Sequence, residues 1–172
     1  MKSSRKIFTS RLRNFVFGVE DSLVSSVGLL SGIAVANISS RNIFLTGMVL
    51  IFVESFSMAI GAFLSESSAD EYASGTETPY AYKQDIIDSV IMFLSYFVSG
   101  LIPLFPYVLL PVSSAFWVSI AFSLFALFLL GATVGKFAHS SLLRGGMRMF
   151  FIGGLAILVG SAIGGFLANS AL

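Results

Sequence analysis

The sequence predicts an all-α membrane protein with five transmembrane helices, and three observations lead to this fold class. Of 172 residues, 56% are hydrophobic and only 11% are charged, whereas about 25% of the residues in a soluble domain are charged. The mean hydropathy is +0.91. Five apolar stretches also reach the roughly 20 residues that a helix needs to cross the hydrocarbon core of a bilayer. We therefore expect an integral membrane protein.

The five expected spans are joined by short connections and cover residues 15–37, 42–65, 86–106, 113–135 and 147–169. Residues 1–14 form a basic segment, and because the apolar run after it is too long for a signal peptide, we expect this run to be retained as the first span. Residues 66–85 are expected to form a short acidic loop on the cytoplasmic side. Residues 15–172 then make a single transmembrane domain.

The third and fourth expected spans form a hairpin. Proline and bulky apolar residues at 103–106 end the third span, and Pro111 precedes the fourth, so a tight, uncharged turn joins them. Tyr107 and Trp117 flank this turn, and amphipathic aromatic rings are enriched where membrane meets water. We expect both rings to anchor the hairpin at that interface.

Basic residues indicate how the chain is oriented, because lysine and arginine are retained on the cytoplasmic side. With the N-terminus in the cytoplasm, nine of the ten lysines and arginines lie in cytoplasmic segments, and only Arg41 faces away. Five spans then place the C-terminus on the non-cytoplasmic side. The same residues occur in short blocks at helix ends rather than along one face, so no nucleic-acid partner is expected.

Three acidic residues, Glu20, Asp21 and Glu54, lie inside expected spans. A charge at the centre of a bilayer costs at least about 2.5 to 3.5 kcal/mol, so such a residue normally faces a partner, a cavity or a transport pathway. Glu20 points about 100° away from Asp21 around the helix and is expected to reach the headgroups or to pair with Arg11 or Arg13. Asp21 and Glu54 are the stronger functional candidates.

Asp21 and Met58 are expected at matching depths in neighbouring spans. At a rise of about 1.5 Å per residue, Asp21 lies roughly 9 Å and Met58 roughly 10 Å below the cytoplasmic surface. Glu54 lies one turn deeper on the same face as Met58. The structural alternatives are that Met58 fills a packing gap and that Asp21 pairs with a buried hydroxyl. The matched depths favour a shared site.

The residue types of this shared site favour a transition-metal ion. The chain has no cysteine, which excludes thiolate ligands. Carboxylates bind hard ions such as Ca²⁺, whereas a thioether adds affinity only for more polarisable ions, so the combination favours Fe²⁺ or Mn²⁺. One aspartate, one glutamate and one methionine are too few for a full ligand shell, and two copies around a two-fold axis double the set. We therefore expect a homodimer with the pathway on its axis.

Small residues recur at four-residue spacing, which lets membrane helices approach each other closely. The pairs are Gly28 and Gly32, Ser57 and Gly61, Gly131 and Gly135, and Gly160 and Gly164. We expect most of them to pack helices within one chain, with Gly28, Gly32 and Gly61 as the packing residues of the first two spans. One such seam is available to a dimer.

Two motifs resemble those of the vacuolar iron transporter family. Residues 17–24 read FGVEDSLV and resemble the family's F-G-x-x-D-G-L-V, with Ser22 in place of the usual glycine. Residues 57–65 read SMAIGAFLS and resemble S-M-A-x-G-E-Y-x-S, with Ala62 in place of the motif glutamate. The ends of the third and fourth spans are similar as well, so the resemblance covers nearly the whole chain. It implies a five-span homodimer that moves Fe²⁺, and often Mn²⁺, out of the cytosol in exchange for protons.

The resemblance assigns Asp21 and Met58 to the metal pathway. Since the motif glutamate is replaced by Ala62, we hypothesise that Glu54 is the relocated acid, and that Asp21 and Glu54 carry the exchanged protons. Well-studied members have a glutamate-rich helical domain between the second and third spans, and only the acidic loop occupies that place here. Three of its acids could form a weak funnel that attracts cations, or a merely solvated loop: Glu66, Asp70 and Glu71.

The sequence leaves three alternatives to metal export. A serine enzyme would need Ser31 and His139, which are expected at very different depths and so cannot meet; we expect no enzyme. A membrane scaffold would use the acids only to hold helices together. A transporter of another cation, such as Ca²⁺, would not need the sulfur of Met58.

The expected partners are metal ions, protons and membrane lipid. Fe²⁺ or Mn²⁺ is the transported substrate, and no cofactor is expected. The protein would reside in the cell membrane of a prokaryote, or in a vacuolar or other organellar membrane of a eukaryote.

Overall fold

The computed structural model describes residues 4–36, 38–75, 79–137 and 141–170. Short connections join six helices in this part of the chain: α1 (Ser4–Val35), α2 (Ser40–Ser74), α3 (Pro79–Leu104), α4 (Pro106–Leu109), α5 (Val112–Phe137) and α6 (Leu142–Ser170). All except α4 give a stretch long and apolar enough to cross a membrane. The predicted all-α fold with five spanning helices is therefore confirmed for the described residues.

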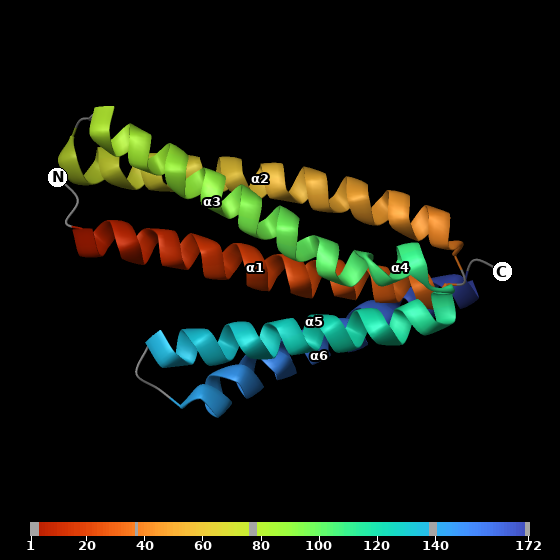
Figure 1. Cartoon of the computed structure of the whole chain (residues 1–172). Coiled ribbons are helices and arrows are strands. Elements are labelled where there is room, and N and C mark those ends of the chain that lie inside the picture. The colour runs from red at the N-terminus through yellow and green to blue at the C-terminus, as the bar shows by residue number, and fades with distance from the viewer. Residues whose placement is uncertain (1–3, 37, 76–78, 138–140, 171–172) are drawn as a thin grey trace.

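The long helices run side by side in alternating directions, with α1 in the centre (Figure 1). Helix α1 packs against α3 on one side and against α6 on the other, while α2 lies against α3 and α5 pairs with α6. In their most apolar stretches, 50% of α1 is buried but only 22% of α2. Helix α1 is thus the central element, and α2 leaves most of its surface uncovered.

The two ends of the bundle differ in charge. Helices α1, α3 and α6 begin at one end, where α2 and α5 finish (Figure 1). We call this end the basic end, because Arg11, Arg13, Lys83 and Lys136 lie there. Helix α6 finishes at the opposite end, as an odd number of spans requires.

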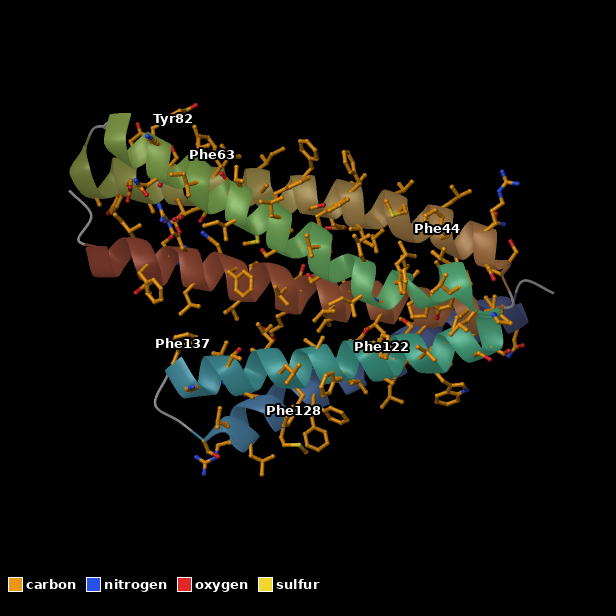
Figure 2. All side chains as sticks on the ribbon, in the orientation of Figure 1. Phe44, Phe63, Tyr82, Phe122, Phe128 and Phe137 are labelled. Atoms are coloured by element: carbon orange, nitrogen blue, oxygen red, sulfur yellow. The ribbon has the colours of Figure 1, made fainter. Side chains whose placement is uncertain are left out.

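The outer surface of the bundle is apolar along its length, as contact with lipid requires. Side chains such as Phe122 and Phe137 project from α5 and are mostly exposed (Figure 2). Near the basic end, the ring of Phe63 on α2 meets that of Tyr82 on α3 edge-to-face, with centroids 5.5 Å apart (Figure 2). Such pairs stabilise helix contacts beyond simple burial, so α2 and α3 are joined near the basic end.

The expected acidic loop at residues 66–85 is largely helical, which corrects the prediction. Helix α2 continues to Ser74, and α3 already begins at Pro79. No proline or glycine interrupts residues 62–74. Gly75 then ends α2 with φ of 71°, a left-handed conformation typical of helix C-termini, and its N–H donates to the carbonyl of Glu71 at 2.8 Å. From Ser4 onwards, the basic segment before residue 15 is likewise helical, as part of α1.

The turn between the third and fourth spans folds inward. Residues 106–109 form the short helix α4, which contacts α2, α3 and α5. Tyr107 is only 2% exposed and belongs to the apolar core, so its predicted place at the membrane interface is wrong. Trp117 is 69% exposed on α5, where it can reach the interface as expected.

Close contact between α1 and α6 depends on glycines. A Cβ atom added to Gly164 would collide with the carbonyl of Gly32, and one added to Gly160 would collide with that of Gly28. Backbones that approach this closely leave no room for a side chain. Gly28 and Gly32 therefore lie at a close contact between two helices, as their four-residue spacing predicted.

Gly61 does not share this role within one chain, so its predicted packing role stays a prediction for a contact between copies. Gly131 of α5 faces Gly145 of α6 in a further backbone contact, but a Cβ atom added to Gly61 would meet no heavy atom within 4 Å. Within the described chain, Gly61 therefore packs no helix against α2. It lies on a part of α2 that the rest of the chain leaves open.

Gly164→Ala should lower the thermal stability of the purified protein, because the added methyl group would collide with the backbone of α1. Overpacking of this kind costs about 1 to 3 kcal/mol. The matched variant Gly154→Ala lies on the same helix, where an added Cβ meets no heavy atom within 4 Å, and should keep the parent Tm. Thermal unfolding in detergent compares the two variants. Equal Tm values would contradict the proposed dependence on close approach.

Candidate functional site

Two carboxylates on different helices lie within electrostatic range of each other. Asp21 on α1 and Glu54 on α2 are close enough for their charges to interact, and both charges act on the hydroxyl of Tyr96 on α3. Both acids are only partly exposed. Like charges repel strongly where water is scarce, so this three-helix junction favours a bound cation or protons.

Tyr96 connects α1 to α3 beside the acids. Its side chain is fully buried, and its hydroxyl lies 2.8 Å from Oγ of Ser25 on α1. One turn earlier, the hydroxyl of Ser22 donates to the backbone carbonyl of Tyr96 at 2.6 Å. Gly100 leaves room for Ser22, because a Cβ atom there would lie 2.7 Å from the serine oxygen. Ser22, which departs from the family motif, therefore forms part of the α1–α3 contact.

Met58 lies one turn nearer the basic end than Glu54. It lines a cleft of about 600 Å³ between α1, α2 and α3, which we call the inner cleft, together with Phe17, Met92, Arg13 and Glu66. Neither Asp21 nor Glu54 belongs to this lining, although Phe17 precedes Asp21 by one turn. The structure thus places Asp21 within electrostatic range of Glu54, while the predicted contact between Asp21 and Met58 stays a prediction.

Two residues of this region were not identified as site residues from the sequence. Met92 adds a second thioether to the inner cleft, and Tyr96 adds the hydroxyl beside the acids. With Asp88, they recur every fourth residue along α3, and all three are buried. Polar or sulfur-containing residues at this spacing share one helix face, which is the signal that would have found them.

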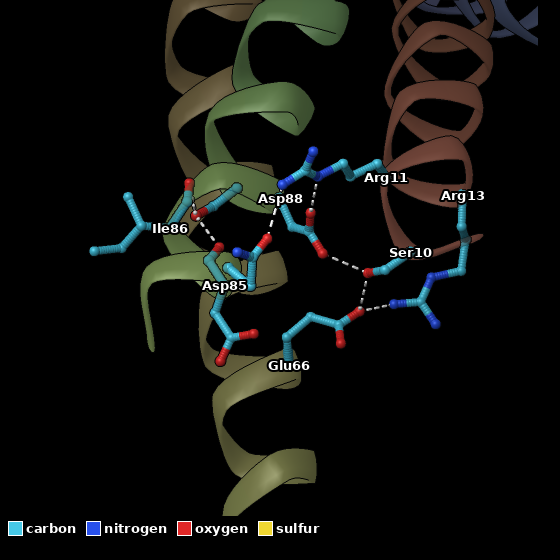
Figure 3. A network of polar contacts seen from close by, with 9 residues as sticks. Ser10, Arg11, Arg13, Glu66, Asp85, Ile86 and Asp88 are labelled. Atoms are coloured by element: carbon cyan, nitrogen blue, oxygen red, sulfur yellow. Dashed lines mark hydrogen bonds and ion pairs between the residues drawn. The ribbon is translucent and has the colours of Figure 1, made fainter. Parts of the chain in front are cut away.

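A network of polar contacts closes the basic end of the same three helices (Figure 3). Arg13 of α1 forms an ion pair with Glu66 of α2. Arg11 donates to the side-chain oxygen of Gln84 on α3 at 2.7 Å, and its Nε lies 3.6 Å from Asp88 Oδ1. Both arginines thus pair with α2 or α3, rather than with Glu20 as one prediction had it.

Ser10 joins the two acids of this network. Its hydroxyl lies 2.5 Å from Asp88 Oδ2 and 3.2 Å from Glu66 Oε1 (Figure 3). Outside Glu66, a second cleft of about 250 Å³ is lined by Thr9, Ser10, Asp70 and Ala73, among others, and we call it the outer cleft. Of the acids expected to attract cations, Glu66 is therefore paired and Asp70 faces the outer cleft, while Glu71 is exposed.

Within the described ranges, no group of three or more histidines, cysteines, aspartates or glutamates is placed to hold a metal ion. One chain thus offers two carboxylates at the three-helix junction and two thioethers in the inner cleft. His139, which a serine enzyme would need, lies outside the described residues, and Ser31 is buried.

The fold and the site define a class of protein, an integral membrane protein with five spanning helices and interacting acids between them. A protein-family model described as the VIT family matches residues 12–79 and 74–165, which is most of the chain. The chain therefore belongs to the VIT family, and its predicted membership of the vacuolar iron transporters is confirmed. No curated protein matches the chain. The family is one of transporters rather than enzymes, and it indicates membrane transport of metal ions.

Proposed function

We propose that the protein exports Fe²⁺ or Mn²⁺ from the cytosol in exchange for protons. The observation that carries this proposal is the pair of interacting carboxylates, Asp21 and Glu54, between helices that span the membrane. Ionised side chains at such depth face a pathway or a partner by default. Membership of a metal-transporter family makes a cation pathway the interpretation that fits best.

The carboxylate pair suggests how metal and protons are exchanged. Two nearby negative charges are compensated by one divalent cation, and metal ligands must lose their protons before the metal binds. When the cation leaves towards the far side, protons can replace it and neutralise the pair again. Asp21 and Glu54 then bind metal and protons in alternation, which is the requirement for exchange.

Sulfur in the inner cleft supports a transition metal over Ca²⁺. Met58 and Met92 both line this cleft, on the basic-end side of the carboxylate pair. Thioethers contribute little to binding hard ions but do bind polarisable ones. If the basic end faces the cytoplasm, as the distribution of lysine and arginine indicates, a cation passes the sulfur atoms before it reaches the acids.

A homodimer would complete the ligand set. The surface of α2 that the chain leaves open carries Val53, Ser57 and Gly61, each exposed and four residues apart. Small residues at this spacing allow a second helix to approach closely. We propose that two copies meet along α1 and α2, so that the acids and Met58 of both copies line one pathway on the two-fold axis.

Asp21→Asn and Glu54→Gln should each lower the initial rate of Mn²⁺ flux in reconstituted vesicles by about tenfold or more, equivalent to about 1.4 kcal/mol. Each change removes one of the two charges that compensate the cation. Glu20→Gln, next to Asp21 but on another side of the helix, should keep the parent rate. A pH dye inside the vesicles should report protons moving against Mn²⁺.

Size-exclusion chromatography of each variant separates transport from scaffolding. An Asp21→Asn protein that stays folded but moves no Mn²⁺ supports the pathway. A variant that unfolds or disperses would instead favour the scaffold, and full flux in a folded variant would contradict the role of Asp21.

Met58→Leu should reduce Fe²⁺ and Mn²⁺ flux several-fold while Ca²⁺ flux, where measurable, changes little, because only polarisable ions use the sulfur. The control is Met48→Leu, since Met48 packs against the apolar core away from the inner cleft. Parallel flux assays with the three ions check this. An equal loss for all three ions would show that Met58 acts by packing and not as a ligand.

A further inference from the structure

The inner and outer clefts meet at a single ion pair. Two residues line both clefts, and they are Arg13 of α1 and Glu66 of α2. Beyond this pair, the inner cleft continues to Met58 and the outer cleft to Ser10 and Asp70. The paired side chains thus form the wall between the sulfur atoms and the outer cleft.

The two side chains of this ion pair differ in how much their surroundings restrain them. The Glu66 side chain is 14% exposed, whereas that of Arg13 is 65% exposed. The Ser10 hydroxyl lies 3.2 Å from Glu66 and 2.5 Å from the buried Asp88, and it donates its single proton to one of these two carboxylates at a time. The carboxylate is therefore a fixed acceptor, while the guanidinium sits largely in water at the end of a flexible side chain.

We propose that Arg13 is a gating residue, whose guanidinium closes the passage between the two clefts by pairing with Glu66. This inference rests on the proposed transport function. Closed, the pair neutralises Glu66 and places a positive charge where a cation must pass. Open, Arg13 moves into water and exposes the Glu66 carboxylate to a cation in the outer cleft.

The physical properties of the pair suit a gate. An ion pair whose cation is mostly solvated is weak, so a divalent cation can compete with Arg13 for the Glu66 carboxylate. The gate therefore opens when the cation displaces Arg13 from Glu66. The separate contacts of Arg11 with Gln84 and Asp88 keep α1 against α3 while Arg13 moves.

Thiol accessibility tests the gate without requiring transport. Because the chain has no cysteine, Met92→Cys places a single thiol in the buried part of the inner cleft, and Ala73→Cys places one in the outer cleft as control. The rate of modification by iodoacetamide is measured in lipid nanodiscs. This reagent is neutral, so changes in local charge do not alter its approach.

Arg13→Gln and Glu66→Gln should each speed modification of the inner thiol by about fivefold, equivalent to about 1 kcal/mol. The first variant removes a positive charge and the second a negative charge, but both break the same ion pair. Arg13→Lys should keep the parent rate, and the exchanged pair Arg13→Glu with Glu66→Arg should return it towards the parent. The outer thiol should react at one rate in all of these proteins.

The proposal is overturned if folded Arg13→Gln and Glu66→Gln proteins both modify the inner thiol at the parent rate. It is also overturned if the outer thiol accelerates equally, because the two clefts are then not separated by this pair. Neither result bears on the flux of Asp21→Asn, so failure of the gate and failure of the transport function are distinguishable.

Discussion

Two carboxylates held inside an apolar helix bundle are the constraint on which the rest of this structure depends. Lipid provides no water to solvate them, so the protein must supply hydroxyls, protons or a cation. Asp21 and Glu54 come from α1 and α2, and the hydroxyl of the buried Tyr96, paired with that of Ser25, lies within range of their charges. The open face of α2, the inner cleft and the polar network at the basic end all follow the seam between these helices.

The two sides of the bundle are held to α1 by different kinds of contact. On the packed side, glycine backbones bring α6 against α1, and α5 against α6. On the other side, α2 and α3 form a pair that is tied to α1 by polar contacts, through Ser22 in the middle and through Arg11 and Arg13 at the basic end. Polar contacts at the edge of a membrane can exchange with water or cations, whereas backbone contacts between glycines cannot. The seam between α1 and the pair of α2 and α3, which polar contacts hold, is therefore where an ion pathway is physically possible.

The sequence was sufficient to predict the parts of the structure that depend on hydrophobicity and backbone spacing. Five spans follow from apolar length, and the close approach of α1 follows from Gly28 and Gly32. The pattern could not tell which glycine has a neighbour in the same chain, and Gly61 has none there. Tyr107 was misplaced for a related reason, since α4 folds back over the core and no local rule predicts that turn.

The candidate site was predictable only in part. An acid in an apolar run is visible in any sequence, and this identified Asp21 and Glu54. Tyr96, their common neighbour on α3, was not identified, because a tyrosine in a membrane helix has many ordinary roles. The pairing of Arg13 with Glu66 joins residues 53 positions apart, and long side chains at the ends of helices have several partners within reach. Only the packing of α1 against α2 and α3 decides among them.

Calorimetry of Mn²⁺ binding in two buffers of different ionisation enthalpy tests most directly whether the acid pair holds metal and protons in alternation. The number of protons released per ion follows from the difference between the two buffers. We predict that the purified parent protein binds Mn²⁺ and releases about one proton or more per ion, and that a protein with Asp21→Asn and Glu54→Gln together does neither. Unchanged binding and proton release in that double variant would contradict the account.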